Sequence, residues 1–243
     1  MKIVTGIVPQ KTLNNQDRQC LLKLHQQYFD NVKPATFFND LQEKDWVILI
    51  KSNSGKVLGF STIQLVWLVV NGVEVLYLYS GDTIVKEEVR SSCALSCAFV
   101  KFMFALIERY PKTLKYWFLI SKGYRTYRFL PLYFKEYYPA YNAEIPQKHK
   151  DALNTIAFYK FGDSYNPDSQ IIMFKNGKDY LKTPIANIPE TKQNDKHVKY
   201  FLDRNPEYFL GNELACIAGI CESNFKPAVY KVKDVTKVDF IWR

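Results

Sequence analysis

The sequence predicts a mixed α/β fold, in which helices flank a central and mostly antiparallel sheet. Apolar residues alternate along strand-like stretches before residue 86, whereas those of 91–109 recur at spacings of three and four, as on one face of a helix. Asn71-Gly72, the strongest hairpin signal in the chain, joins two long strand-like stretches. The 243 residues are 47% hydrophobic, which allows a substantial core and excludes global disorder.

The first expected elements are one strand and two helices. Lys2–Val8 is a short strand that Pro9 ends, because proline has no N–H to donate to a sheet. Asn15–Asp30 is an amphipathic helix whose large apolar residues recur on one side. A shorter helix over Phe37–Leu41 follows Pro34.

A meander of three strands comes next. Asn53-Ser54-Gly55 forms its first turn and Asn71-Gly72 its second, because these residue types tolerate the positive φ of tight turns. Gly81 interrupts the third strand and indicates a bulge or kink. The three strands are expected over Trp46–Lys51, Val57–Val70 and Val73–Val85.

The spacing of the apolar residues then changes from the two-residue period of a strand to the period of a helix. Leu95, Phe99, Phe102 and Leu106 form one stripe of a helix over Ser91–Arg109. A buried strand over Tyr116–Ile120 and a helix over Thr126–Tyr137 follow. The order strand, two helices, three strands, helix, strand, helix is typical of a mixed sheet covered by helices.

The pattern weakens after Pro139, and we divide the chain there. Residues 1–145 are expected to form the core domain, and residues 146–243 a C-terminal extension that partly completes the same sheet. Its expected elements are a helix over Ala152–Phe161, a hairpin over Ile171–Leu181 around Asn176-Gly177, a loop over Thr183–Gln193, a helix over Lys196–Arg204, a strand over Glu213–Ile220 and a terminal strand over Tyr230–Trp242.

Composition excludes several classes of protein. The most apolar stretch, Ile63 to Tyr79, is interrupted by polar residues, so we expect no membrane span, and no signal peptide is evident. Five cysteines without a CxxC pair, and three histidines without metal-like spacing, predict neither a disulfide scaffold nor a metal site. They indicate a reducing cytoplasm. Ten glycines leave no Gly-rich phosphate loop.

The net charge of +9 is concentrated in one part of the chain. Residues 101–150 hold ten basic and three acidic residues, and thus +7 of the total. Such a local patch suits a phosphorylated ligand or an acidic protein partner better than a uniform coat would.

The strand over residues 83–85 and the six residues Arg90-Ser91-Ser92-Cys93-Ala94-Leu95 together resemble the acyl-CoA motif [QR]-x-x-G-x-[GA] of the GNAT-type N-acyltransferase superfamily. The resemblance implies a GNAT-like fold, in which backbone amides at the start of the following helix hold the donor's pyrophosphate. Cys93 and Leu95 stand at the two small-residue positions of the motif. By this resemblance the donor-binding residues are Ile84, Val85, Arg90, Ser91, Ser92 and Cys93.

A second stretch, Tyr133-Phe134-Lys135-Glu136-Tyr137-Tyr138-Pro139, is similar to the Y-x-K-x-G-F-x-P pattern of the same superfamily. The resemblance implies that Tyr133 is the general acid toward the leaving thiolate. Asp82 is the candidate general base, because it follows Gly81 where sheets of this superfamily splay around the thioester. Each residue also has a purely structural alternative. Asp82 could be a turn or bulge residue that accepts hydrogen bonds from nearby amides, and Tyr133 could be an aromatic residue of the core.

Three cations follow the strand that ends at Ile120: Lys122, Arg125 and Arg128. The resemblance to the GNAT fold implies that this strand end opens on the donor side of the active-site cleft. They could bind the phosphates of CoA or dock an acidic acyl carrier protein. An ordinary solvated face is the alternative.

The leading hypothesis is therefore a cytoplasmic GNAT-like N-acyltransferase. It would move an acyl group from acyl-CoA, or from the phosphopantetheine of an acyl carrier protein, to an amine of a small molecule or peptide. No covalently bound cofactor and no metal are expected. Leu95 favours a second reading, a GNAT-shaped binding module without catalysis. A third and least favoured reading is a single-stranded nucleic-acid-binding protein that uses the basic and aromatic patch of residues 112–135.

Overall fold

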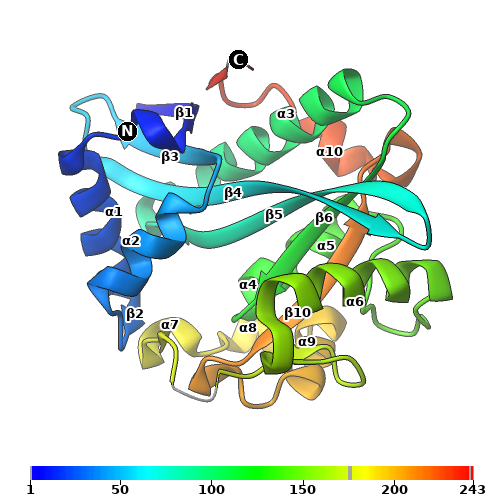
Figure 1. Ribbon diagram of the computed structural model, residues 1–243. Helices are drawn as coiled ribbons and strands as arrows, with labels where there is room; N and C mark the ends of the chain where they lie inside the picture. The colour runs from blue at the N-terminus through cyan, green and yellow to red at the C-terminus, as the bar shows by residue number, and fades with distance from the viewer. Residues whose placement is uncertain (1, 175–176, 241, 243) are drawn as a thin grey trace.

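The computed structural model describes residues 2–174, 177–240 and 242, and is built around a nine-stranded mixed sheet (Figure 1). The strand order is β11-β1-β3-β4-β5-β6-β10-β8-β7. The strands are β1 (Ile3–Pro9), β3 (Trp46–Ser52), β4 (Val57–Val70), β5 (Val73–Val85), β6 (Leu114–Ser121), β7 (Tyr165–Asn166), β8 (Ile171–Ile172), β10 (Glu213–Gly219) and β11 (Val238–Phe240). A separate two-stranded sheet joins β2 (Phe29–Asp30) to β9 (Tyr180–Leu181).

Most neighbouring strands run antiparallel. Among the described residues, the parallel pairs are β5 with β6 and β1 with β11. The helices are α1 (Asn15–Tyr28), α2 (Pro34–Gln42), α3 (Ala94–Arg109), α4 (Tyr124–Tyr127), α5 (Phe129–Tyr133), α6 (Gln147–Phe161), α7 (Thr183–Ala186), α8 (Glu190–Gln193), α9 (Lys196–Arg204) and α10 (Pro227–Val232). Among the short 3₁₀ helices, η2 (Glu87–Ser92) matters most for the site.

Helices cover both faces of the sheet. On one face, α3, α5, α9 and α10 pack on alternate residues of the central strands, such as Ile48, Leu78 and Trp117. On the other face, α1 and α2 cover β3 and β4. Helix α6 covers β5, β6 and β10 on that same face. The central strands are therefore buried on both sides. Within the described residues, none of the helices combines the length and apolar composition that spanning a membrane requires.

The predicted fold class is confirmed. The first helix is shorter than the predicted Asn15–Asp30, because Phe29–Asp30 form β2, a strand between α1 and α2 that the predicted order lacks. The extended start of the third helix is wrong: α3 begins at Ala94, because residues 87–92 form η2 and Cys93 adopts a left-handed conformation with φ 56°. The single helix over Thr126–Tyr137 is also wrong. The chain forms α4 and α5 instead, since Pro131 has no N–H to bond the carbonyl of Tyr127.

Three predictions in the second half need correction. Strand β8 pairs with β7 and β10, whereas β9 pairs with β2, so Ile171–Leu181 is not a hairpin. Asn176 of its expected turn lies outside the described residues. The loop over Thr183–Gln193 contains α7 and α8. The terminal strand is shorter than expected: α10 is followed by β11, which runs parallel to β1.

The pairing of β5 creates the space for the site. Strand β5 pairs with β6 only from Val75 to Ser80, although it continues to Val85. On its other side, a register shift opposite Thr62 marks a bulge at residues 81–82. The last residues of β5 thus lack a β6 partner and border a cavity.

Candidate active site

Two cavities meet beside the end of β5. The first, here called the apolar cavity, has a volume of about 270 Å³ and lies between β5, α3 and α4. The second, the polar cavity, has a volume of about 650 Å³ and lies between β5, α1 and α2. Phe29, Thr83, Lys122 and Thr126 line both cavities. The two cavities therefore border each other at these four residues.

The start of α3 forms one wall of the apolar cavity. Arg90, Cys93 and Leu95 line this cavity. Cys93 has φ 56° and ψ 10°, a left-handed conformation that glycine adopts most readily. The backbone here thus has the shape that a glycine would favour, although the residue is cysteine. The side chain of Leu95 occupies part of the same wall and is 7% exposed.

Two of the expected donor residues face elsewhere. The Ser92 hydroxyl donates to the carbonyl of Val89 and accepts from the amide of Ala94. Within the described residues, neither Ser91 nor Ser92 belongs to the lining of the apolar cavity. The Ser92 hydroxyl thus stabilises the turn before α3, and phosphate binding by the backbone amides of the two serines stays a prediction. Ile84 and Val85, by contrast, both line the cavity.

Asp82 projects into the polar cavity from the bulge of β5. Its side chain is 28% exposed. Burial raises the pKa of this carboxyl above the ordinary value of 3.8, and the carboxylates of Asp40 and Asp179 act in the same direction. The charges of His25 and Lys178 oppose the rise without cancelling it. A carboxyl whose pKa is shifted toward neutrality suits a general base.

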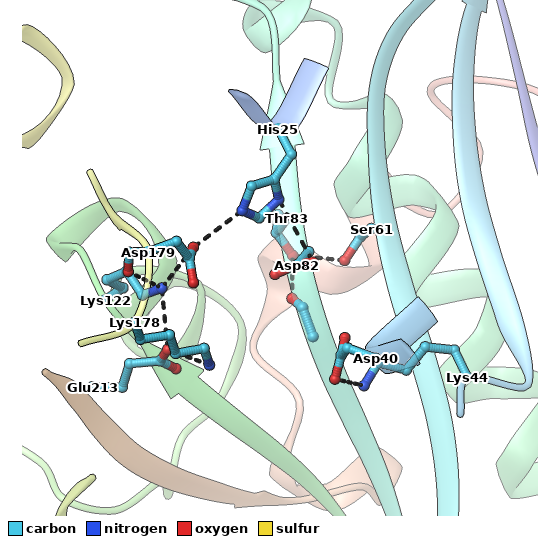
Figure 2. A network of polar contacts seen from close by, with 11 residues as sticks. His25, Asp40, Lys44, Ser61, Asp82, Thr83, Lys122, Lys178, Asp179 and Glu213 are labelled. Carbon is cyan, nitrogen blue, oxygen red and sulfur yellow. Dashed lines mark hydrogen bonds and ion pairs between the residues drawn. The ribbon is translucent and has the colours of Figure 1, made fainter. Parts of the chain in front are cut away.

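A network of charges surrounds Asp82 (Figure 2). Nδ1 of His25 lies 3.6 Å from Oδ2 of Asp82, and Nε2 of the same ring lies 3.0 Å from Oδ2 of Asp179. The ammonium of Lys122 lies 3.0 Å from Asp179 and 3.3 Å from Glu213. Glu213 also accepts from Lys178 at 3.0 Å. The network joins α1, β5, β6 and the extension.

Tyr133 is buried behind the apolar cavity. Ser96, whose side chain acts to lower the pKa of Tyr133, lines that cavity. Burial raises the pKa of Tyr133, so the phenol keeps its proton at neutral pH. Within the described residues, Tyr133 is not part of the cavity lining, whereas Tyr124 is. Tyr133 therefore lies beside the cavity without forming part of its described lining.

The three expected phosphate-binding cations have different surroundings. Arg125 lines the apolar cavity and donates to the carbonyl of Ile185 at 2.7 Å. Lys122 lines both cavities, but its two carboxylate partners already neutralise the ammonium. Arg128 pairs with Asp195 at 3.2 Å and, within the described residues, lines neither cavity. Only Arg125 of the three faces the donor side with its charge uncompensated by a described carboxylate.

Sequence reasoning missed the partners of Asp82. His25 was considered only for metal spacing, and Asp179 and Glu213 lie about 100 residues or more away in the chain. No local pattern marks such residues, because the fold alone brings them together. In the described part of the chain, no cluster of three or more His, Cys, Asp or Glu is arranged to hold a metal ion.

Comparison with known proteins gave matches in structure alone. No family model and no curated protein matches the sequence. A probable N-acyltransferase from Enterococcus faecalis, described as a conserved protein of unknown function, is 14% identical at a TM-score of 0.41; the match covers 56% of this chain and 33% of that protein. A GNAT-family N-acetyltransferase from Escherichia coli in complex with CoA is 15% identical at a TM-score of 0.37, over 50% and 65% of the two chains.

Arabidopsis thaliana NAA60 in complex with acetyl-CoA is 15% identical at a TM-score of 0.38, and the match covers 55% of this chain and 89% of that one. These solved structures thus include a member of the GNAT family, which residues 83–95 and 133–139 resemble, and a probable N-acyltransferase, all at low identity and at TM-scores below 0.5.

Proposed function

We propose that this protein transfers an acyl group from an acyl thioester to an amine. The observation that carries the proposal is the meeting of two cavities beside Asp82, one apolar and one lined by acidic residues. The apolar cavity suits the pantetheine arm and acyl chain of a donor. The polar cavity suits an amine, whose positive charge the carboxylates favour.

Several features support a donor in the apolar cavity. Residues 83–85 of β5 pair with β4 but have no β6 partner, so the backbone groups on their β6 side, apart from the Val85 carbonyl that accepts from Arg90 Nε at 3.0 Å, could bond an extended pantetheine arm. The first turn of α3 opens on the same cavity beside Arg90 and Arg125. Acyl-CoA and the phosphopantetheine of an acidic acyl carrier protein both fit this charge, and we propose acyl-CoA as the simpler donor.

The proposed reaction conserves every proton. Asp82 removes a proton from the acceptor's ammonium group, and the freed amine attacks the thioester carbonyl. The tetrahedral intermediate loses a second proton from its nitrogen and collapses with cleavage of the carbon–sulfur bond, which yields an amide and a thiolate. Tyr133 gives its proton to the thiolate and regains one from that nitrogen, and the proton held by Asp82 is finally released to solvent, so the products are an amide, a thiol and one free proton. Five cysteines, all free in the structure, suit a reducing cytoplasm as the setting.

Calorimetric titration at low salt tests donor binding directly, with acetyl-CoA, a long-chain acyl-CoA and an acyl carrier protein as separate ligands. We expect binding of at least one acyl-CoA, and no donor binding at all would overturn the proposal. The second step is a turnover assay with a panel of amines. Asp82→Asn should then lower turnover by about 10²- to 10⁴-fold while leaving donor affinity intact.

One observation favours a catalytically inactive binding module. The side chain of Leu95 narrows the apolar cavity at a small-residue position of the acyl-CoA motif. In that case Leu95→Gly would create CoA binding that the native chain lacks. Binding by the native chain, followed by turnover that depends on Asp82, would exclude the module.

A further inference from the structure

The imidazole of His25 lies between two carboxylates from distant parts of the chain (Figure 2). Asp82 comes from β5, and Asp179 comes from the segment just before β9. The ring is 3% exposed and stacks on Phe29 with centroids 4.4 Å apart. A buried, stacked imidazole with both nitrogens directed at carboxylates is held in one orientation.

Asp179 determines which ring nitrogen of His25 carries the hydrogen. Burial alone would raise the pKa of Asp179, but the hydrogen bond to His25 and the charges of Lys122 and Lys178 hold it well below its usual range. An ionised carboxylate can only accept, so Nε2 of His25 must donate to it. The neutral ring therefore has a lone pair on Nδ1.

That lone pair is unsatisfied. Nδ1 is buried and has no hydrogen-bond partner among the described residues. Oδ2 of Asp82 lies 3.6 Å away, slightly too far for a hydrogen bond. Because the side chain of Asp82 is partly exposed, a small rotation would close this gap once the carboxyl carries a proton to donate.

We propose, on the basis of the acyl transfer suggested above, that His25 takes over the proton that Asp82 removes from the acceptor amine, and that Asp179 fixes the ring for this transfer. The proton moves from the amine nitrogen to Oδ2 of Asp82 and then to Nδ1 of His25. Asp82 returns to its ionised form, and the imidazolium is stabilised by the carboxylate of Asp179. His25 and Asp179 act through Asp82 and are thus positioning residues.

The other charged groups around Asp82 and His25 neutralise one another, so the pair can hold one additional proton. Lys122 and Lys178 are matched by Asp179 and Glu213, and the ammonium of Lys44 is matched by Asp40 at 2.7 Å. In the described structure Asp82 is close enough to form an ion pair with His25 alone, although the charge of Lys178 also acts on it from farther away. A protonated His25 beside an ionised Asp82 therefore completes the balance. The groups that face the pair are Asp40 of α2, Lys44 after α2, Tyr79 of β5, Lys122 after β6, Lys178 and Asp179 of the extension, and Glu213 of β10.

Nitrogen NMR of the ligand-free, full-length protein tests the arrangement without any substrate. In ¹⁵N-labelled protein we expect the neutral ring of His25 to carry its hydrogen on Nε2 and its lone pair on Nδ1. In Asp179→Asn the Nδ1–H tautomer should become populated, because the amide N–H can donate to Nε2.

Glu213→Gln is the matched control. It removes another buried carboxylate that contacts Lys122 and Lys178, but one that does not touch His25. It should leave the tautomer unchanged. A native ring with its hydrogen on Nδ1, or an equal change in both variants, would overturn the proposal.

Kinetics test the transfer itself. His25→Asn should lower turnover about ten- to a hundredfold, and should move the acidic limb of the pH profile upward, because the His25 charge that lowers the pKa of Asp82 is removed. A uniform loss of turnover with an unshifted profile would mean a merely structural role for His25. The two proposals fail separately: absent acyl-CoA binding overturns the acyl transfer, whereas the NMR result decides the His25 arrangement in either case.

Discussion

Gly81 packs so closely against Thr62 that a Cβ atom at residue 81 would lie 2.5 Å from the Thr62 hydroxyl oxygen. The side chain of Lys44 approaches the same point, at 3.1 Å from its Cε. The bulge that presents Asp82 therefore depends on glycine for lack of space, since no positive φ is involved at this residue.

Gly81→Ala should consequently destabilise the protein and displace Asp82. We expect the free energy of unfolding to fall by about 1–3 kcal/mol, the usual cost of overpacking, as measured by urea denaturation. Gly6→Ala is the control, because its Cβ would meet only the Asp239 carbonyl oxygen, at 3.6 Å. Equal losses in the two variants would contradict the close packing described above.

Cys93→Gly should stabilise the turn before α3. The left-handed backbone costs a non-glycine residue roughly 1–2 kcal/mol, whereas glycine loses more chain entropy on folding. The net gain in unfolding free energy should be up to about 1 kcal/mol, seen as a higher thermal midpoint. Cys97→Gly, one turn into α3, has no such strain to relieve and should lower the midpoint.

Leu95→Ala should lower the stability of the protein but increase its affinity for the donor. Removing this 7%-exposed side chain should reduce the unfolding free energy by about 2–3 kcal/mol and widen the apolar cavity. Calorimetry should show tighter acyl-CoA binding than in the native chain. Leu106→Ala, in the buried face of the same helix but outside the cavity lining that the structure describes, should destabilise without changing donor affinity.

Arg125→Ala should weaken donor binding about tenfold, the loss expected for one charge-assisted hydrogen bond. Arg125 lines the apolar cavity, whereas Arg128, three residues later, pairs with Asp195. Arg128→Ala is therefore the matched control and should retain native affinity. A larger effect in Arg128→Ala would place the donor's phosphates elsewhere.

Asp82→Asn should be more stable than the native chain at neutral pH. Burial raises the pKa of Asp82, so the folded chain keeps this proton at pH values where the unfolded chain has released it. Ionised Asp82 thus lowers stability above about pH 3.8, and the difference between the two chains should vanish as pH falls to that value. Urea unfolding across this range measures it, with Asp163→Asn, an exposed acid of the same cavity, as the control.

The sequence predicted the core of this fold well because local patterns determine it. The alternation in residues 73–79 and the Asn71-Gly72 turn specify the long hairpin of β4 and β5, and Gly81 correctly marked the bulge. Pro131 was underestimated as a helix breaker. The pairings of β8 and β9 were missed because two-residue strands leave no periodic signal.

The residues of the candidate site could likewise be predicted only where a local pattern marks them. Asp82, Ile84, Val85 and Arg90 could be placed from their position around the third strand of the meander, and all four line a cavity. His25, Lys178, Asp179 and Glu213 could not, because their proximity to Asp82 is long-range in sequence. Their roles, and those of Asp82 and Tyr133, stay predictions until the experiments above are done.

The late position of β10 in the chain has a consequence for biosynthesis. Strand β6 ends at Ser121, but its antiparallel partner β10 begins only at Glu213, and β11 reaches β1 later still. While the chain emerges from the ribosome, β6 therefore remains an open sheet edge, able to pair with a neighbouring nascent chain. We expect newly made protein to need protection by a chaperone until residue 219 is available, and chains interrupted before that point to aggregate.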